Sequence, residues 1–256
     1  RLHQKICYRL SLSRQCGERV TGSMKIVDVL PVKLGAVMYP EHDKVKSMLI
    51  DEINSHGDSY EFQKVDAHAK GLEHFDYYSP LSSDKYKDFR EWIEKQAEIY
   101  AQDILGYETS DFLLTDSWLN VCDSGGKQSP HFHINAAICA LYYINFDDEV
   151  HSPTYFYRPN DSMNFPDYFA YMLTNQKETK YNYINEVVGV EGSLLLWPAN
   201  TCHGYTTNYG DNRITVSSNL MPRYINDVRI EPLTKEERHT AMTTFRSGKL
   251  WDYPLL

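Results

Sequence analysis

Two histidines that flank a single residue are the first feature of this sequence that could do chemistry. His131 and His133 lie where a turn-forming segment enters an apolar run. In an extended backbone, side chains two positions apart point to the same face, so both imidazoles can reach one metal ion, and Asn135 shares that face. Because an isolated His-x-His pair is more often structural, a metal site needs further residues from elsewhere in the chain.

A third histidine follows a stretch that would deliver it to the start of a strand. Gly192, an apolar run and Pro198 precede His203, and this order is typical of a turn, a buried strand and a second turn. The turn-forming residues 208–212 come next, and Arg213 follows them directly. A hairpin at this turn would place His203 and Arg213 on adjacent antiparallel strands.

Arg213 heads a segment with a strand pattern. Alternation places Thr215 and Ser217 on the same face of that strand as Arg213. A guanidinium inside a protein is costly unless an anion satisfies it, and its planar fork suits a carboxylate. The structural alternative is a salt bridge with a nearby acid such as Asp211.

The order of these motifs resembles that of the Fe(II)/2-oxoglutarate-dependent oxygenases, and within them a bacterial and phage, prolyl-hydroxylase-like branch with a His-x-His motif. The resemblance extends from Trp118 to Asn219. Each motif is weak alone, but the order and the spacing are specific. The matching positions are Trp118, Gly125, Gly126, His131, His133, the run Leu141-Tyr142-Tyr143-Ile144, Gly192, Pro198, His203 and Arg213.

This resemblance implies a double-stranded β-helix, or jelly roll, with Fe(II) at one mouth and 2-oxoglutarate as co-substrate. His131 and His203 would be metal ligands and, with Arg213, the catalytic residues. Arg213 would bind the far carboxylate of 2-oxoglutarate, and Tyr143 and Thr215 would hydrogen-bond to that carboxylate. The implied activity is that of a hydroxylase-type dioxygenase, which acts on a protein side chain or a small molecule and releases succinate and CO2.

His133 departs from the pattern of the broader superfamily. That superfamily has an Asp or Glu at this position, as part of a two-histidine, one-carboxylate triad. Three arrangements follow: His131, His133 and His203 all bind the metal; His133 lies in the second shell and another residue completes the site; or the register shifts and His133 and Asn135 form the pair.

Two other functions stay open on the sequence. A three-histidine, non-haem oxygenase that does not use 2-oxoglutarate would keep the histidines, but Arg213 argues against it. A catalytically inactive jelly-roll binding module would keep the cavity without the metal. Nothing in the sequence identifies the substrate.

The elements that must position these residues predict an α+β, mainly β fold: a jelly roll supported by N-terminal helices. Apolar residues at three- and four-residue steps predict helices over 41–56 and 84–105. A turn is expected at 123–126, and residues 58–82 are expected to be loop with short extended pieces. Residues 159–185 are polar and rich in Asn and Tyr, which suits either a lid over the substrate or a solvated loop. Strands are expected within 25–37, 112–121, 134–146, 154–158, 187–198, 202–207, 213–221 and 228–230.

Composition bounds the class of protein. Residues 25–256 are expected to form one oxygenase domain, and residues 1–24 are interpreted as a cloning remnant or a disordered arm, with Met24 as a natural start. A net charge of -9 disfavours a nucleic-acid partner. No apolar run approaches the ~18 residues of a membrane span. The five scattered cysteines indicate reduced thiols and a cytoplasmic protein. A homodimer is compatible with the sequence, although no residue requires one.

Overall fold

The structure, a computed structural model, describes residues 32–56, 63–64, 69–74, 79–108, 111–157, 184–225 and 228–232. The segment 1–24, the expected strand from residue 25 and most of the polar insertion 159–185 lie outside the described residues. In the described part, no helix has the length and apolar character needed to cross a membrane.

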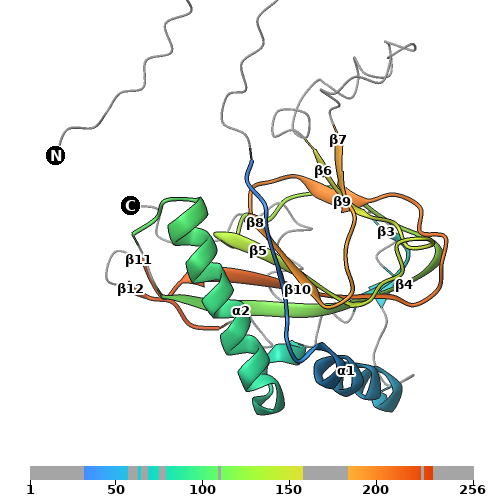
Figure 1. Ribbon diagram of the computed structural model, residues 1–256, viewed down its shortest axis with the longest axis horizontal. Coiled ribbons are helices and arrows are strands. Elements are labelled where there is room, and N and C mark those ends of the chain that lie inside the picture. Colours follow the sequence, from blue (N-terminus) through green and yellow to red (C-terminus); the bar gives the residue numbers. More distant parts are fainter. Residues whose placement is uncertain are drawn as a thin grey trace, which may run out of the picture. The chain divides into compact units, whose positions relative to one another are not determined.

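Antiparallel strands dominate the fold and form one curled sheet. The main path of the sheet runs in the order β1-β8-β5-β10-β4-β9-β6-β7, and β3 joins β2 to the side of β4. Figure 1 shows the sheet curling from β5 and β10 round to β9 and β6. The strands are β1 (Gly35–Met38), β2 (Gln63–Lys64), β3 (Ala69–His74), β4 (Phe112–His131), β5 (Ile138–Asn145), β6 (Thr154–Tyr157), β7 (Ile184–Val187), β8 (Ser193–Pro198), β9 (His203–Tyr205) and β10 (Arg213–Pro222); β11 (Tyr224–Ile225) and β12 (Val228–Arg229) form a separate pair.

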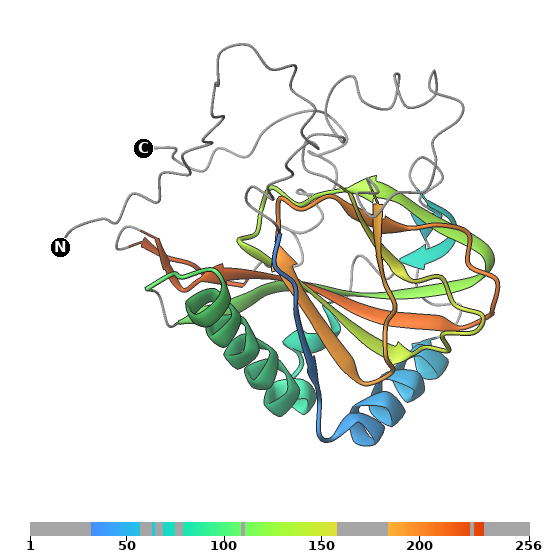
Figure 2. The ribbon, with the colours of Figure 1, turned by 45° about the horizontal axis from the view of Figure 1, so that its top comes forward.

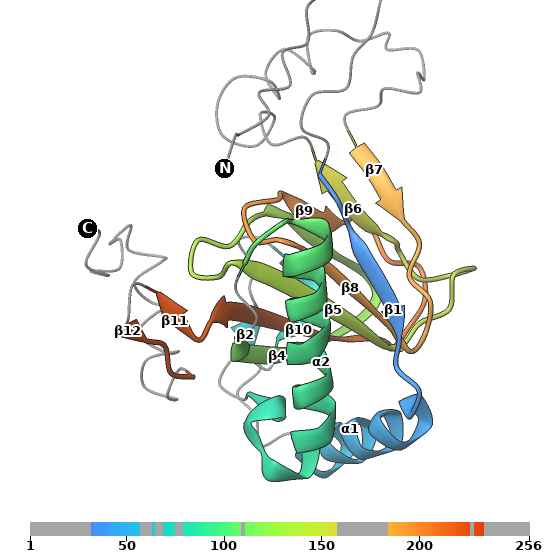
Figure 3. The ribbon, with the colours of Figure 1, turned by 60° about the vertical axis from the view of Figure 1, so that its left-hand side comes forward.

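Two helices support the sheet, and both predictions of helix are confirmed. Helix α1 is His42–His56, and α2 is Lys87–Ile99, preceded by the short 3-10 turn Asp84–Tyr86 and continued by the π-helical turn Tyr100–Ile104. Figure 2 shows α1 and α2 on the same side of the curled sheet, and Figure 3 shows α2 crossing its strands. The α+β, mainly β class is therefore confirmed.

Alternation along the strands divides the interior into two cores. In β5, Ile138, Ala140, Tyr142 and Ile144 pack against the helices, whereas Cys139, Leu141 and Tyr143 face the inside of the curl. In β8, Leu194 and Leu196 likewise face the helices, and Leu195 and Trp197 face inward. Because side chains on a strand alternate between faces, these fully apolar runs can fill both cores at once. The inner face of the curl is where the polar motifs of the sequence must meet.

The turn predicted at 123–126 is wrong, because β4 continues through it. Opposite this segment, β3 passes from Lys70 to Leu72 while β4 passes from Lys127 to Cys122, so these residues form a bulge. Gly125 adopts a φ of 86°, a conformation that glycine reaches without strain. The turn-forming composition therefore bends one long strand, which pairs with β10 in its first part and with β9 in its last.

The hairpin predicted between His203 and Arg213 is also wrong. Strand β4 lies between β9 and β10 in the sheet. His203 pairs with His131 near the end of β4, and Arg213 pairs with Cys122 in its middle. The segment 206–212 is thus a connection across β4, and long-range pairing has overridden the local preference for a hairpin.

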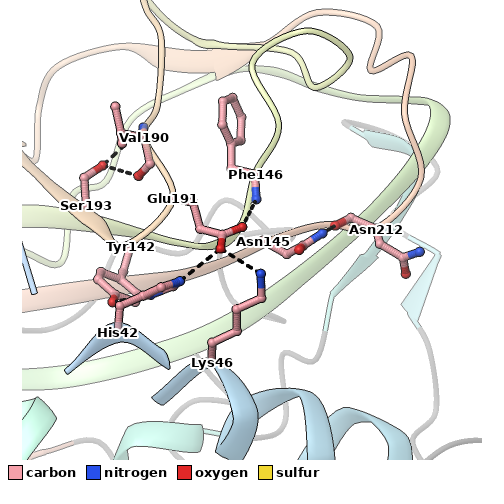
Figure 4. Close-up of polar contacts among 9 residues, drawn as sticks. All are labelled: His42, Lys46, Tyr142, Asn145, Phe146, Val190, Glu191, Ser193 and Asn212. Atoms are coloured by element: carbon pink, nitrogen blue, oxygen red, sulfur yellow. Dashed lines mark hydrogen bonds and ion pairs between the residues drawn. The ribbon is translucent and has the colours of Figure 1, made fainter. Parts of the chain in front are cut away.

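Glu191 joins α1 to the sheet through a polar hub (Figure 4). Its carboxylate accepts hydrogen bonds from Lys46 Nζ at 2.7 Å, from His42 Nε2 at 3.2 Å and from the backbone N–H of Phe146 at 3.2 Å. The other ring nitrogen of His42 lies 2.8 Å from the Tyr142 hydroxyl. Burial alone would raise the pKa of Glu191, but the bonds from Lys46, Phe146 and His42 outweigh it and hold the pKa below its ordinary value. The hub fixes the loop that precedes β8.

Candidate active site

A cavity inside the curl brings together residues from five strands. His131 from β4, His203 from β9, and Arg213 and Thr215 from β10 line it, and His133 borders it just beyond the end of β4. Ser217 also lines the cavity, as alternation along β10 predicts. Residues that are distant in the sequence therefore meet in one space.

The three histidines form a compact cluster. The ring centroids of His131 and His203 are 4.4 Å apart, those of His133 and His203 5.2 Å, and those of His131 and His133 5.4 Å. One nitrogen from each ring lies within 4.8 Å of the others. Small ring rotations would bring these nitrogens to the bond length of about 2.1 Å from a shared ion. Within the described part of the chain, no carboxylate joins the cluster.

His203 is held in one tautomer by the backbone. Its Nδ1 lies 2.9 Å from the carbonyl oxygen of Thr201, and a carbonyl only accepts, so Nδ1 carries the hydrogen and Nε2 keeps its lone pair. Burial, and then the nearby His131 and His133, lower the pKa of His203 well below its ordinary value. His203 is therefore neutral at physiological pH, as a metal ligand must be.

His133 is held in a similar way by side chains. Its Nδ1 lies 2.6 Å from Asn219 Oδ1 and 3.2 Å from the Cys139 sulfur. Its backbone N–H donates to the carbonyl oxygen of Ala199 at 2.9 Å. Burial, followed by the neighbouring His131, lowers the pKa of His133 to about 4. His133 is thus neutral as well.

Arg213 is a buried cation without a charged partner in the described residues. Its side chain is only 1% exposed, Nε donates to the carbonyl oxygen of Ser152 at 3.0 Å, and Nη2 has no partner. Aromatic rings surround the guanidinium carbon: the centroid of Tyr205 is 4.2 Å away, that of Phe146 5.7 Å and that of Tyr143 5.9 Å. Rings stabilise a cation but do not neutralise it, so the site calls for an anion.

Asp211 is not that anion. One of its carboxylate oxygens accepts the backbone N–H of Ser124 at 3.0 Å, and its carbonyl oxygen lies 2.9 Å from His151 Nε2. No ion pair joins Asp211 to Arg213 in the described residues. The structural alternative for Arg213 therefore finds no support.

Unsatisfied polar atoms gather at this cavity. Asn120 Oδ1, Trp197 Nε1 and Arg213 Nη2 are buried without a hydrogen-bond partner, and all three residues line it. The Tyr205 hydroxyl is likewise without a partner in good geometry, with the Cys122 thiol as a weak neighbour. A buried polar atom left unpaired costs about 1–3 kcal/mol, so the clustering of such atoms in one cavity indicates a polar ligand.

Of the two residues expected to assist Arg213, one lines the cavity and one stands behind it. Thr215 lines the wall and accepts a bond from Asn120 Nδ2 at 3.3 Å. The Tyr143 hydroxyl lies 2.6 Å from Thr154 Oγ1, and Thr154 rather than Tyr143 lines the cavity.

Sequence reasoning missed two residues that the alternation of strands could have found. Tyr205 lies two positions after His203 on β9, and Asn219 lies two positions after Ser217 on β10. Each continues an inward-facing series that the sequence already indicated. Trp197 and Asn120 carried no comparable signal, because an inward tryptophan or asparagine is ordinary in a strand.

Comparison with known proteins adds independent findings. Residues 116–219 match a protein family described as "Putative 2OG-Fe(II) oxygenase". The fold is similar to that of a prolyl-4-hydroxylase from Pseudomonas putida, with 12% sequence identity, a TM-score of 0.50, and coverage of 75% of this chain and 93% of that one. It is also similar to that of SnoN, a non-heme alpha ketoglutarate dependent epimerase from nogalamycin biosynthesis, with 13% identity, a TM-score of 0.52, and coverage of 78% and 88%. A search of curated proteins found no significant match.

These likenesses bear on two different levels. At such low identity the solved structures establish the fold, and they confirm the predicted jelly roll. The matched family segment extends from β4 through most of β10, so it contains the histidine cluster and Arg213.

Proposed function

Because this chain belongs to the 2-oxoglutarate- and Fe(II)-dependent oxygenase superfamily, we propose that it hydroxylates a protein side chain or a small molecule. In this proposal His131, His133 and His203 are the metal ligands. Arg213 binds the far carboxylate of 2-oxoglutarate, assisted by Thr215. Tyr143 acts from behind the wall, through its contact with Thr154.

The donor set of the chain fits Fe(II). Imidazole nitrogens are suitable ligands for iron, and they must be unprotonated to bind it. The lowered pKa values of His133 and His203 meet this condition, and in both rings Nδ1 is engaged, which leaves Nε2 for the ion. The third histidine in place of a carboxylate leaves this centre without an anionic side chain in the described residues.

The unpartnered guanidinium of Arg213 is the observation that carries the proposal. It lies in the cavity that contains the histidine cluster, and a dicarboxylic acid could contact both ends at once. The low polarity of the surrounding rings strengthens a carboxylate–guanidinium pair. A three-histidine oxygenase without 2-oxoglutarate would leave this buried charge unexplained.

The remaining chemistry divides between the bound groups and the chain. Bound iron, 2-oxoglutarate and O2 together supply the oxidising power, with succinate and CO2 as by-products. The chain orients the co-substrate through Arg213 and excludes water with the apolar inner wall. Leu141, Phe156 and Trp197 belong to that wall.

A binding experiment tests the proposal. Thermal unfolding is measured with Mn(II), with and without 2-oxoglutarate, for the wild-type protein, for Arg213→Ala and for Arg223→Ala. Arg223 pairs with Asp111 outside the cavity, which makes it a matched control. We expect 2-oxoglutarate to stabilise the wild-type protein and the control by several degrees and to leave Arg213→Ala unchanged. Equal stabilisation of all three proteins would contradict the assignment of Arg213.

Partners and location stay predictions beyond this site. The net charge of -9 argues against a nucleic-acid substrate. Cytoplasmic location and a homodimer are expectations from the sequence alone; size-exclusion chromatography with light scattering would test the second.

A further inference from the structure

We propose that Asn219 is a positioning residue for the metal site: it fixes His133 in the Nδ1–H tautomer and so directs the Nε2 lone pair toward His131 and His203. The inference rests on the proposed function, since it names the group that makes His133 able to replace the usual carboxylate. No motif in the sequence drew attention to Asn219.

The contact between these two side chains is short and buried. Asn219 Oδ1 lies 2.6 Å from His133 Nδ1, and Asn219 is only 4% exposed. Asn219 continues the inward series of Arg213, Thr215 and Ser217 on β10. Its own backbone is anchored, because its carbonyl oxygen accepts the Thr115 hydroxyl at 3.2 Å.

The chemistry of an amide oxygen decides which nitrogen keeps its lone pair. The oxygen only accepts, so the ring nitrogen that faces it must carry a hydrogen, and a neutral imidazole has only one. Nε2 is then unprotonated. The Cys139 sulfur also lies near Nδ1, at 3.2 Å, but sulfur is a weak acceptor and a poor substitute for the amide.

His203 shows the same scheme with a different partner. Its Nδ1 also faces an amide-type oxygen, the Thr201 carbonyl, at 2.9 Å. One ligand is thus oriented by the backbone next to it, and the other by a side chain on a distant strand. Groups of this kind commonly change metal affinity by about 10- to 100-fold when they are removed.

Three variants separate this role from a structural one. Asn219→Leu keeps the approximate volume and removes the acceptor, whereas Asn219→Asp keeps an acceptor at the same place. Ser218→Ala is the control, because Ser218 is equally buried on β10, but alternation turns it toward the helix side. Circular dichroism melts establish that each variant folds.

Two measurements are made on each protein. Long-range proton–nitrogen NMR of the metal-free protein reads the His133 tautomer, with a His133→Gln sample to assign its signals. Titration with Mn(II), followed by the electron paramagnetic resonance of the free ion, gives the metal affinity. We expect Asn219→Leu to lose the pure Nδ1–H tautomer and to bind Mn(II) about 10- to 100-fold more weakly. Asn219→Asp and Ser218→Ala should keep the tautomer and about the wild-type affinity.

The outcomes distinguish this inference from the function on which it rests. An unchanged tautomer or an unchanged Mn(II) affinity in Asn219→Leu would overturn the role of Asn219, while the metal site itself would stand. Loss of affinity in Ser218→Ala equal to that in Asn219→Leu would show a structural effect and also overturn it. A wild-type protein that binds no Mn(II) would overturn the proposed function and the inference with it.

Discussion

The guanidinium carbon of Arg213 lies 4.2 Å from the centre of the Tyr205 ring. Tyr205 is two residues beyond His203 on β9, so this short strand carries one side chain at the histidine cluster and another at the buried cation. Burial raises the pKa of Tyr205 well above its ordinary value, and its hydroxyl therefore remains a donor. The ring holds the guanidinium in place, and the hydroxyl remains available to the same anion.

Tyr205→Phe should weaken 2-oxoglutarate binding by several-fold, since the variant loses one hydrogen bond of about 1 kcal/mol and keeps the ring. Tyr205→Leu should weaken it further, because the stacking on Arg213 is lost as well. Calorimetric titration with 2-oxoglutarate in the presence of Mn(II) measures both effects. The Mn(II) affinity in the absence of 2-oxoglutarate should stay unchanged; a parallel loss would mean that Tyr205 supports the whole site and not the anion alone.

His203→Gln should reduce Mn(II) affinity by at least 100-fold, because it removes one of three ligands from a centre that has no anionic side chain in the described residues. Equilibrium dialysis with metal analysis gives the affinity. His42→Gln is the matched control: His42 lies on α1, where it contacts Glu191 and Tyr142, outside the cluster. If both variants kept wild-type affinity, the histidine cluster would not be the metal site.

The metal-free protein should lose stability as the pH falls from about 6.5, the ordinary value for histidine, to about 4. The pKa of His133 is lowered to about 4 and that of His203 lies well below its ordinary value, so between these limits the unfolded chain binds more protons than the folded one. Stability therefore rises with pH across this window and is fully present above it.

Urea unfolding in EDTA at pH 7.5, 6 and 5 measures this dependence. The same series with His133→Gln isolates the contribution of one histidine from that of the carboxylates, and its curve should be flatter. An equally steep curve would show that His133 does not remain neutral in the folded protein.

Glu191→Gln should lower the free energy of unfolding by about 1 kcal/mol, as expected for weakened bonds to a partly exposed carboxylate. The change affects the bonds from Lys46, His42 and the Phe146 backbone, so α1 is held less firmly to the sheet. Chemical denaturation measures the loss, and Glu98→Gln, which alters an exposed helical pair with Lys95, should change stability little. Metal affinity should remain at the wild-type value in both variants.

Local periodicity predicted most of the elements and part of the site. The helix over 84–105 and the inward face of Arg213 and Thr215 follow from the spacing of side chains, which the sequence displays directly. The relation between His203 and Arg213 does not follow from it, because β4 enters between their strands from a distant part of the chain. Asn219 was overlooked for a related reason: its meaning depends on His133, a partner 86 positions away.

The bulge at residues 123–126 gives β4 the character of a ruler. Cys122, before the bulge, pairs with Arg213, and His131, after it, pairs with His203. A single stretch of backbone thus spans the interval between the cation and the histidine cluster. That interval would set how many carbons a diacid needs to touch both ends, so a residue added to or removed from the bulge should change which chain length of diacid the cavity prefers.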